Sequence, residues 1–282
     1  MIGKISTAVK RPVLRYHGGK WRLAKWIISH FPQHRIYTEV FGGAASVLMQ
    51  KPRSYAEVYN DKWDIVVNVF QVLRDNPEQL RRALELTPFS RTEFNTCGDV
   101  DLAAITDPVE KARRTILRSF AGFGSASTNA KHSTGFRANS NRSGTTPAHD
   151  WMHYPEHIQS FVHRLRGVII ENKDYREVLK QHDTPQTLHF LDPPYVHATR
   201  NMARGNAAYA HEFTDDDHRD MAKEVNALKG MVVICGYESE LYNELFGAWH
   251  KVRKSHHADG ARDRIECLWM NYRPSGHLFR LN

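Results

Sequence analysis

The sequence predicts an α/β protein whose mostly parallel sheet is interrupted by a helical insert. Three observations predict this class. Short apolar segments alternate with segments of helical spacing, the alternation stops over residues 76–166, and it resumes at residue 168. The 282 residues suffice for one large α/β core with an inserted subdomain. We expect one domain from residues 1–75 and 167–282, and a second from the helical and loop insert 76–166.

The first part of the chain alternates helices and strands. Apolar residues recur at helical spacing over 24–31, so a helix is expected there. Residues 36–41 form a strand candidate, which leads through a pair of glycines into an apolar helix over 46–50. A second strand is expected over 55–59, and a helix with regular apolar spacing covers 65–73.

The glycine pair Gly42-Gly43 lies between a strand and a helix, as in the opening unit of nucleotide-binding folds. The glycine spacing matches neither the dinucleotide fingerprint nor the P-loop. A nucleoside cofactor without phosphates therefore remains open. Asp61 follows the second strand, where an acid commonly bonds ribose hydroxyls. The alternative is that Asp61 only caps the following helix.

The insert carries several helix signals and one long polar segment. Helices are expected after Pro77, from the capping box Ser90 to Glu93, from Asp107-Pro108, and over 155–166. Residues 122–150 are rich in Gly, Ser, Thr and Asn and almost free of acids. Such a loop is compatible with contacts to phosphates and base edges, and equally with a flexible loop without function. The candidate residues of the insert for such contacts are Arg118, Lys131, Arg137, Asn139 and Arg142.

The alternation then resumes up to the C-terminal region. The expected elements are strands over 168–171, 188–191 and 231–235, helices over 214–229 and 239–246, and a closing pair of strands over 249–255 and 265–272. The polar segment 197–211 is a candidate for a mobile lid.

The apolar run Leu188–Leu191 ends abruptly in Asp192-Pro193-Pro194-Tyr195. Two prolines must end a strand because they cannot donate to the sheet, and each restricts the residue before it to extended geometry. The Asp192 carboxylate and the Pro193 carbonyl should thus be held rigidly at the carboxyl end of a strand, the edge where open α/β sheets bind ligands. With an aromatic ring beside them, they suit a planar base that carries an amino group. Taken alone, the tetrapeptide could equally be a simple turn.

Composition narrows the functional class. The formal charge of +8 favours a polyanionic partner such as nucleic acid. The three cysteines are scattered and indicate a reducing compartment rather than a disulfide framework. We expect no signal peptide and no membrane span, since the sequence has no sufficiently long apolar run.

The order of these motifs resembles the Dam-like, alpha-group N6-adenine DNA methyltransferases over nearly the whole chain. The matching segments are Tyr16–Lys20, Glu39–Ala44, Asn60-Asp61, Asp174-Tyr175 and Asp192–Tyr195. In that family the target-recognition insert lies between the second- and third-strand motifs, as residues 76–166 do here. Arg264, Glu266 and Asn271 are also similar to residues of its last strands. Ala44-Ala45, where many members keep a third glycine, and Trp63, where an Asn is common, depart from the pattern.

The resemblance implies a Rossmann-like, S-adenosylmethionine-dependent methyltransferase sheet with an antiparallel C-terminal strand and a target-recognition insert. It implies methyl transfer from S-adenosylmethionine to N6 of an adenine flipped out of double-stranded DNA. The implied catalytic residues are Asp192, Pro193, Pro194 and Tyr195. The implied cofactor-binding residues are Tyr16, Gly18, Gly19, Lys20, Glu39, Phe41, Gly42, Gly43, Asp61, Asp174, Tyr175 and Asp192. No metal and no obligate protein partner are expected, and the expected location is the cytoplasm of a bacterium or a phage-infected cell.

Two other functions are compatible with parts of the pattern. Methyltransferases acting on RNA or on protein amides more often carry Asn at the first position of the tetrapeptide and lack so large an insert. A nucleic-acid binder that has lost its cofactor would not need Asp192, Lys20 and Gly42, which are all present. The sequence does not reveal the recognised bases, or whether the role is restriction, phage self-protection or regulation.

Overall fold

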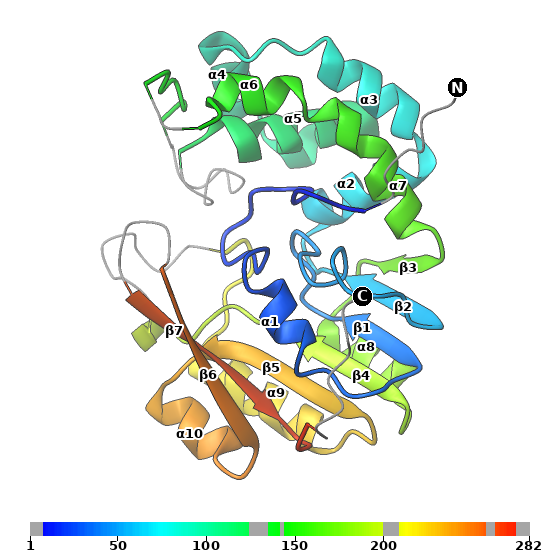
Figure 1. The fold of residues 1–282 in the computed structure, drawn as a ribbon, viewed down its shortest axis with the longest axis vertical. Helices are drawn as coiled ribbons and strands as arrows, with labels where there is room; N and C mark the ends of the chain where they lie inside the picture. The colour runs from blue at the N-terminus through cyan, green and yellow to red at the C-terminus, as the bar shows by residue number, and fades with distance from the viewer. Residues whose placement is uncertain (1–7, 124–134, 142–143, 200–208, 258–262, 275–282) are drawn as a thin grey trace. The chain divides into compact units, whose positions relative to one another are not determined.

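A computed structural model describes residues 8–123, 135–141, 144–199, 209–257 and 263–274. Its sheet has seven strands in the order β3-β2-β1-β4-β5-β7-β6 (Figure 1). The strands are β1 (Ile36–Glu39), β2 (Ala56–Asn60), β3 (Val168–Glu171), β4 (Thr187–Leu191), β5 (Met231–Tyr237), β6 (His250–His257) and β7 (Asp263–Met270). β1 pairs in parallel with β2 and β4, and β4 with β5. β7 runs antiparallel to both β5 and β6, so the predicted mostly parallel sheet with an antiparallel C-terminal strand is confirmed.

The chain divides into two compact units. Unit 1 comprises Met1–Trp21, Gly43–Gln50 and Trp63–Ile170. Unit 2 comprises Arg22–Gly42, Lys51–Lys62 and Glu171–Asn282. Unit 1 therefore contains the whole predicted insert 76–166 together with flanking segments.

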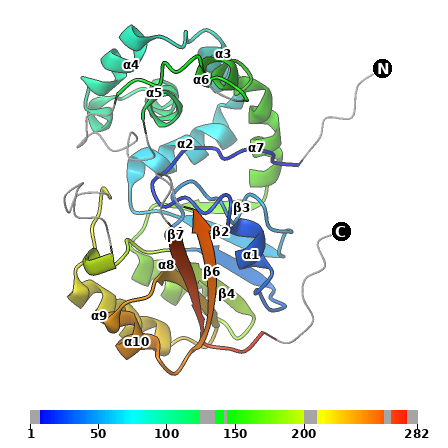
Figure 2. The ribbon, with the colours of Figure 1, turned by 60° about the vertical axis from the view of Figure 1, so that its left-hand side comes forward.

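Unit 2 holds most of the sheet and covers it with helices. These are α1 (Ala24–Ile28), α8 (Tyr175–His182), η4 (His197–Thr199), α9 (Asp215–Asn226) and α10 (Glu240–Phe246), of which α9 and α10 lie side by side (Figure 2). Successive residues of a strand face opposite sides of a sheet. Accordingly Leu191 packs into the apolar cluster formed with α8, α9 and α10, whereas the Phe190 ring lies 6.0 Å from that of Phe31, which follows α1.

Unit 1 is helical in its larger part. Its helices are α2 (Asp64–Asp75), α3 (Pro77–Glu85), α4 (Arg91–Gly98), η1 (Leu102–Ala104), α5 (Pro108–Ala121), α6 (Pro147–Met152), η3 (Pro155–His157) and α7 (Ile158–Leu165). The central helix α5 packs against α2, α3 and α4. It begins as predicted, because Asp107 caps it by accepting a hydrogen bond from the Val109 amide and Pro108 occupies its first turn.

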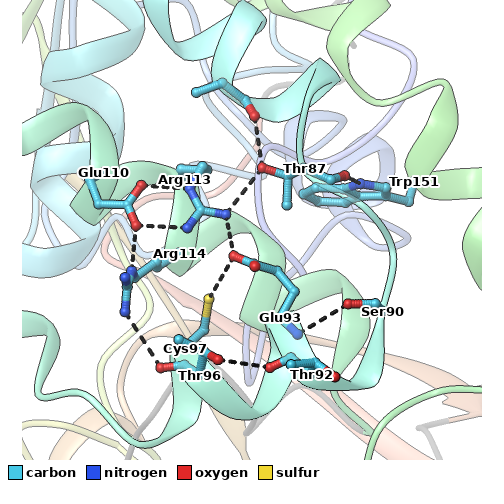
Figure 3. A network of polar contacts seen from close by, with 11 residues as sticks. Thr87, Ser90, Thr92, Glu93, Thr96, Cys97, Glu110, Arg113, Arg114 and Trp151 are labelled. Carbon is cyan, nitrogen blue, oxygen red and sulfur yellow. Dashed lines mark hydrogen bonds and ion pairs between the residues drawn. The ribbon is translucent and has the colours of Figure 1, made fainter.

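A polar network ties α5 to α4 and to the segment between α3 and α4 (Figure 3). The Arg113 guanidinium donates to both Glu110 oxygens at 2.6 and 2.7 Å, to Glu93 at 2.6 Å and to the Thr87 hydroxyl at 3.1 Å. The predicted cap at Ser90 is present, since its hydroxyl accepts from the Glu93 amide at 3.1 Å. The Glu93 carboxylate, however, faces Arg113, so the glutamate of the predicted capping box serves the network instead.

The structure differs from the sequence analysis at two places, one of which is an expectation that was wrong. Residues 46–50 form successive turns rather than a helix, and Ala45, the residue before them, has a left-handed φ of 52°. The second difference is α8, which the sequence analysis did not anticipate. Asp174 caps this helix by accepting from the Arg176 amide, and Val178 and Leu179 supply its buried face.

Candidate active site

The Asp-Pro-Pro-Tyr corner follows directly after β4, whose five residues are all buried. Asp192 is half-buried, and Pro193 and Pro194 are buried. β4 lies between β1 and β5, with Phe190 paired to Glu39 on β1. The Val40 amide extends this ladder by donating to the Phe190 carbonyl at 3.1 Å. The corner and the segment beginning at Phe41 therefore leave neighbouring parallel strands at the same edge of the sheet.

Tyr195 closes the corner and is held at its hydroxyl and at its ring. The hydroxyl donates to the Glu266 carboxylate and lies 3.7 Å from the Cys235 sulfur. The ring meets that of Tyr237 edge-on, with centroids 4.7 Å apart. Burial raises the pKa of Tyr195 well above its ordinary value, and the neighbouring Cys235 and Glu266 raise it further. The phenol is therefore a hydrogen-bond donor at any physiological pH.

The segment after β1 approaches β2 too closely for any side chain at residue 42. A Cβ on Gly42 would lie 2.2 Å from a ring carbon of buried Tyr59 and 2.8 Å from the Asn60 carbonyl. The Gly42 amide donates to that carbonyl at 2.7 Å. Glu39, the last residue of β1, is buried and accepts from the Tyr37 hydroxyl at 2.8 Å. Glycine is required here because the buried backbone packs directly against the Tyr59 ring and the Asn60 carbonyl.

Two asparagines join the carboxyl ends of β1, β2 and β3. The buried Asn60 amide donates to the Val40 carbonyl at 2.9 Å and the Lys173 carbonyl at 3.2 Å, and its oxygen accepts from the Lys173 amide at 2.9 Å. Asn172 donates to the Asp61 carbonyl at 2.8 Å. These bonds fix the backbone around Asp61. Trp63, not Asp61, occupies the N-cap position of α2, so the capping alternative for Asp61 is wrong.

Asp174 and Tyr175 follow β3 and have different roles. Asp174 caps α8 and pairs with Lys62 at 3.1 Å. Partial burial raises its pKa, but the Arg176 amide and Lys62 outweigh this, so the pKa of Asp174 lies below its usual value. The Tyr175 ring contacts Phe41 at 5.4 Å and Phe213 at 5.9 Å, and Phe41 and Phe213 lie 5.5 Å apart.

This aromatic trio, Phe41, Tyr175 and Phe213, has one unsatisfied polar atom. Within the described part of the chain, nothing hydrogen-bonds the buried Tyr175 hydroxyl. Burial raises the pKa of Tyr175 to about 12, with Arg176 opposing this and Asp174 adding to it. A protonated donor inside an aromatic surface is suited to an aromatic ligand with acceptor nitrogens.

The remaining predicted cofactor residues lie in unit 1. The Gly19 amide donates to the Tyr16 carbonyl at 3.0 Å, and Gly18 has a φ of 74°. Lys20 is buried and its ammonium group donates to the Gly18 carbonyl at 2.6 Å. Gly43 has a φ of 47°, and a Cβ there would lie 2.9 Å from the Tyr16 ring. The two glycine motifs of the sequence thus meet at Tyr16.

The comparison with known families identifies the chain. Residues 16–259 match the family described as D12 class N6 adenine-specific DNA methyltransferase. The chain belongs to this family. The match spans the Tyr16–Lys20 motif, the glycine pair, the helical insert and the Asp-Pro-Pro-Tyr corner, and it confirms the predicted DNA adenine-N6 methyltransferase activity. A comparison with curated proteins finds no match to the sequence.

The methyltransferase places its predicted DNA-binding residues in different environments. Arg118 on α5 is only 4% exposed, and burial lowers the pKa of its guanidinium. Arg137 is half-buried and donates to the Phe120 carbonyl at 2.9 Å, near the end of α5. Asn139 is exposed. Lys131 and Arg142 lie outside the described residues. The assignment of these five residues to DNA binding stays a prediction.

The described residues of the methyltransferase show neither a group of metal ligands nor a membrane-spanning helix. Among the described residues, no three or more His, Cys, Asp or Glu side chains form a group that could hold a metal ion. No helix in the described ranges is both long and apolar enough to cross a membrane.

The structure adds residues that the sequence analysis did not assign to the site. Phe213 completes the aromatic trio, Asn60 holds the strand ends, and Tyr237 packs on Tyr195. Glu266 was singled out only through the family resemblance. The sequence signals were weak, since Phe213 and Glu266 lie far along the chain from the groups that they contact.

Proposed function

We propose that the enzyme transfers a methyl group from S-adenosylmethionine to N6 of an adenine that has been flipped out of duplex DNA. The observation that carries the proposal is the adjacency of two features in unit 2. The Asp-Pro-Pro-Tyr corner follows β4, and the segment with Phe41 and Gly42 follows the neighbouring parallel strand β1.

The residues at this edge fit a nucleoside cofactor. The aromatic trio offers apolar faces and the unpaired Tyr175 hydroxyl to an adenine, and Asp61 would bond the ribose. The backbone at Gly42 packs directly against β2, with no room for a side chain, which fixes the course of the chain that follows β1. Tyr16, Gly18, Gly19, Lys20, Glu39 and Gly43 are proposed to hold the methionine end. When bound, S-adenosylmethionine supplies an electrophilic methyl group on a sulfonium.

The chain's own contribution is to activate a poor nucleophile. The lone pair of an adenine amine is delocalised into the ring. The Asp192 carboxylate and the Pro193 carbonyl would accept its two N–H bonds, which favours a more tetrahedral nitrogen with a directed lone pair. The carboxylate also stabilises the positive charge that develops on the nitrogen, and holding both reactants in line supplies much of the remaining rate.

Tyr195 would stack on the face of the extruded base, a contact worth about 1–3 kcal/mol by analogy with single-strand binders. Extrusion is necessary because the amine cannot enter a pocket while its base is stacked in the duplex. The DNA-binding residues proposed for the insert are Arg118, Lys131, Arg137, Asn139 and Arg142.

The test measures transfer of tritiated methyl from S-adenosylmethionine to unmethylated DNA by wild type and Asp192→Ala. We expect the variant to lose at least about 100-fold in rate, while Asp216→Ala, a change of an exposed aspartate on α9, stays at the wild-type rate. Equal rates for Asp192→Ala and wild type would contradict the proposal. Competition between DNA, RNA and protein acceptors identifies the substrate, and sequencing of methylated adenines in a methylation-free host gives the recognition sequence.

A further inference from the structure

β7 carries a buried carboxylate that contacts the catalytic corner. Glu266 is only 2% exposed and accepts the hydroxyl hydrogen bond of Tyr195. The Cys235 sulfur lies 3.2 Å from the same carboxylate oxygen. Two neutral donors, a phenol and a thiol, thus converge on one buried acid.

Burying a carboxylate costs free energy because the charge loses its hydration. Glu57, a second buried carboxylate, shows how the protein offsets this cost elsewhere. Glu57 on β2 is 3% exposed and pairs with the buried ammonium group of Lys51 at 2.7 Å. That arrangement is an ordinary buried ion pair. At Glu266 a phenol and a thiol lie at hydrogen-bonding distance of the carboxylate, so this buried acid is attached directly to the catalytic motif.

The same strand makes a second attachment to the chain that follows β4. Arg264, two residues before Glu266 on β7, donates to the Thr199 carbonyl at 3.5 Å. Its guanidinium also lies over the Tyr237 ring, 5.4 Å from the centroid, and Tyr237 in turn packs edge-on against Tyr195. In the β5–β7 ladder Tyr237 pairs with Glu266. β7 therefore supports the hydroxyl of Tyr195 directly through Glu266, and its ring indirectly through Arg264 and Tyr237 of β5.

We propose that Glu266 is a positioning residue for Tyr195. By anchoring the hydroxyl, it fixes the tilt of the ring so that the ring presents its face to the target adenine beside Asp192. This inference rests on the proposed function, because Tyr195 has a base to stack on only if an adenine enters the corner. Stacking itself requires only the ring, so the hydroxyl matters here solely as the point of attachment.

The experiment uses the full chain and single-turnover methyl transfer to duplex DNA at saturating S-adenosylmethionine. Glu266→Leu should lower the rate by about 10–100-fold, the equivalent of losing one hydrogen bond to a charged group. Glu266→Gln keeps an acceptor for the phenol and should recover most of that loss. Tyr195→Phe should be slowed like Glu266→Leu, and adding Glu266→Leu to it should have little further effect, because both changes remove the same contact.

Two further readouts separate positioning from general damage. The fluorescence of 2-aminopurine at the target position reports base extrusion and stacking, and it should change in Glu266→Leu and Tyr195→Phe alike. S-adenosylmethionine affinity, measured by calorimetry, should stay within about threefold of wild type. Glu57→Gln is the matched control: it alters an equally buried carboxylate and should change the unfolding midpoint without changing the rate of the folded enzyme.

The outcomes distinguish the two ideas. An active wild type with full activity in Glu266→Leu or in Tyr195→Phe overturns the positioning role alone. An equally large additional loss when Glu266→Leu is placed in the Tyr195→Phe background also overturns it, because Glu266 would then act on the fold in general. A wild type that transfers no methyl group to DNA overturns the proposed function, and the inference with it.

Discussion

The carboxyl edge of the sheet and the helical region of unit 1 use their polar side chains for different purposes. At the sheet edge, neutral amides such as Asn60 and Asn172 bond backbone groups that follow different strands. In the helical region, charged pairs around Arg113 join one helix to another. The asparagine amides fix the loops at the sheet edge, on which ligands can bind. The ion pairs around Arg113 hold helices together.

Several basic side chains of the helical region make contacts within the fold, so the net charge alone does not measure the basic surface. A net charge of +8 suggests a DNA-binding surface, and the insert supplies many of the arginines. The fold itself uses several of them, since Arg113 joins carboxylates, Arg118 is buried and Arg137 bonds a backbone carbonyl near a helix end. Composition therefore overstates the basic surface that the helical region offers to DNA.

The largest effect on stability is expected for Arg113→Ala. It leaves Glu110 and Glu93, two partly buried carboxylates, without their shared guanidinium. We expect a loss of about 3 kcal/mol in the free energy of unfolding, as for other broken buried pairs, measured by urea denaturation. Arg82→Ala on α3 is the control, because that side chain is 67% exposed and its change should cost less than about 0.5 kcal/mol. A loss below 1 kcal/mol for Arg113→Ala would place its network among ordinary surface pairs.

At the sheet edge, Gly42→Ala is expected to damage both stability and cofactor binding. The added methyl group would overlap the ring of buried Tyr59. Overpacking of this kind costs about 1–3 kcal/mol, and the displaced backbone should also weaken S-adenosylmethionine binding in calorimetry. Gly98→Ala is the matched control, since nothing lies within 4 Å of a Cβ at that position. Unchanged cofactor affinity in Gly42→Ala would separate this turn from the cofactor site.

The sequence predicted those parts of the site that depend on neighbours along the chain. Two prolines after an apolar run define the end of β4 wherever the strand lies. The same local pattern of apolar residues and turn residues predicted strands over 36–41 and 55–59, which overlap β1 and β2, although these strands end at Glu39 and Asn60. The turn over 46–50 was missed because apolar burial alone does not distinguish a helix from packed turns.

The sequence analysis could not predict contacts between residues that lie far apart in the chain and are brought together by the strand order of the sheet. Tyr195 and Glu266 are 71 residues apart and meet only because β7 inserts beside β5. Phe213 reaches Phe41 and Tyr175 in the same way, from the segment before α9. No periodicity within one segment encodes such contacts, so they require the strand order.

The charged pairs of the helical region should also give it a characteristic acid sensitivity. Hydrogen bonding to Arg113 lowers the pKa of Glu110 from 4.5 to about 2, with burial opposing this and Arg114 adding to it. Because the pKa is depressed in the folded state, the stabilisation is complete above about 4.5 and is lost as pH falls towards 2. Glu110→Gln should therefore be less stable than wild type at pH 7 and should lose less stability between pH 4.5 and 2.5.

Urea midpoints across this pH range check that expectation. Glu224→Gln, at an exposed position on α9, is the control and should parallel wild type at every pH. A Glu110→Gln curve that also runs parallel to wild type would mean that the acid sensitivity arises from other carboxylates.

The smallest effect is expected for Arg137, a basic side chain with a hydrogen bond inside the fold and a predicted contact with a DNA phosphate. Because its guanidinium donates to the Phe120 carbonyl near the end of α5, Arg137→Ala should lower stability by about 1 kcal/mol. If it also contacts a phosphate, as the sequence predicts for both Arg137 and Arg142, each alanine variant should lower the salt slope of DNA binding by about one unit. A slope that falls for Arg142→Ala but not for Arg137→Ala would leave Arg137 a purely structural role, and the helical region would then contribute fewer phosphate contacts than its charge suggests.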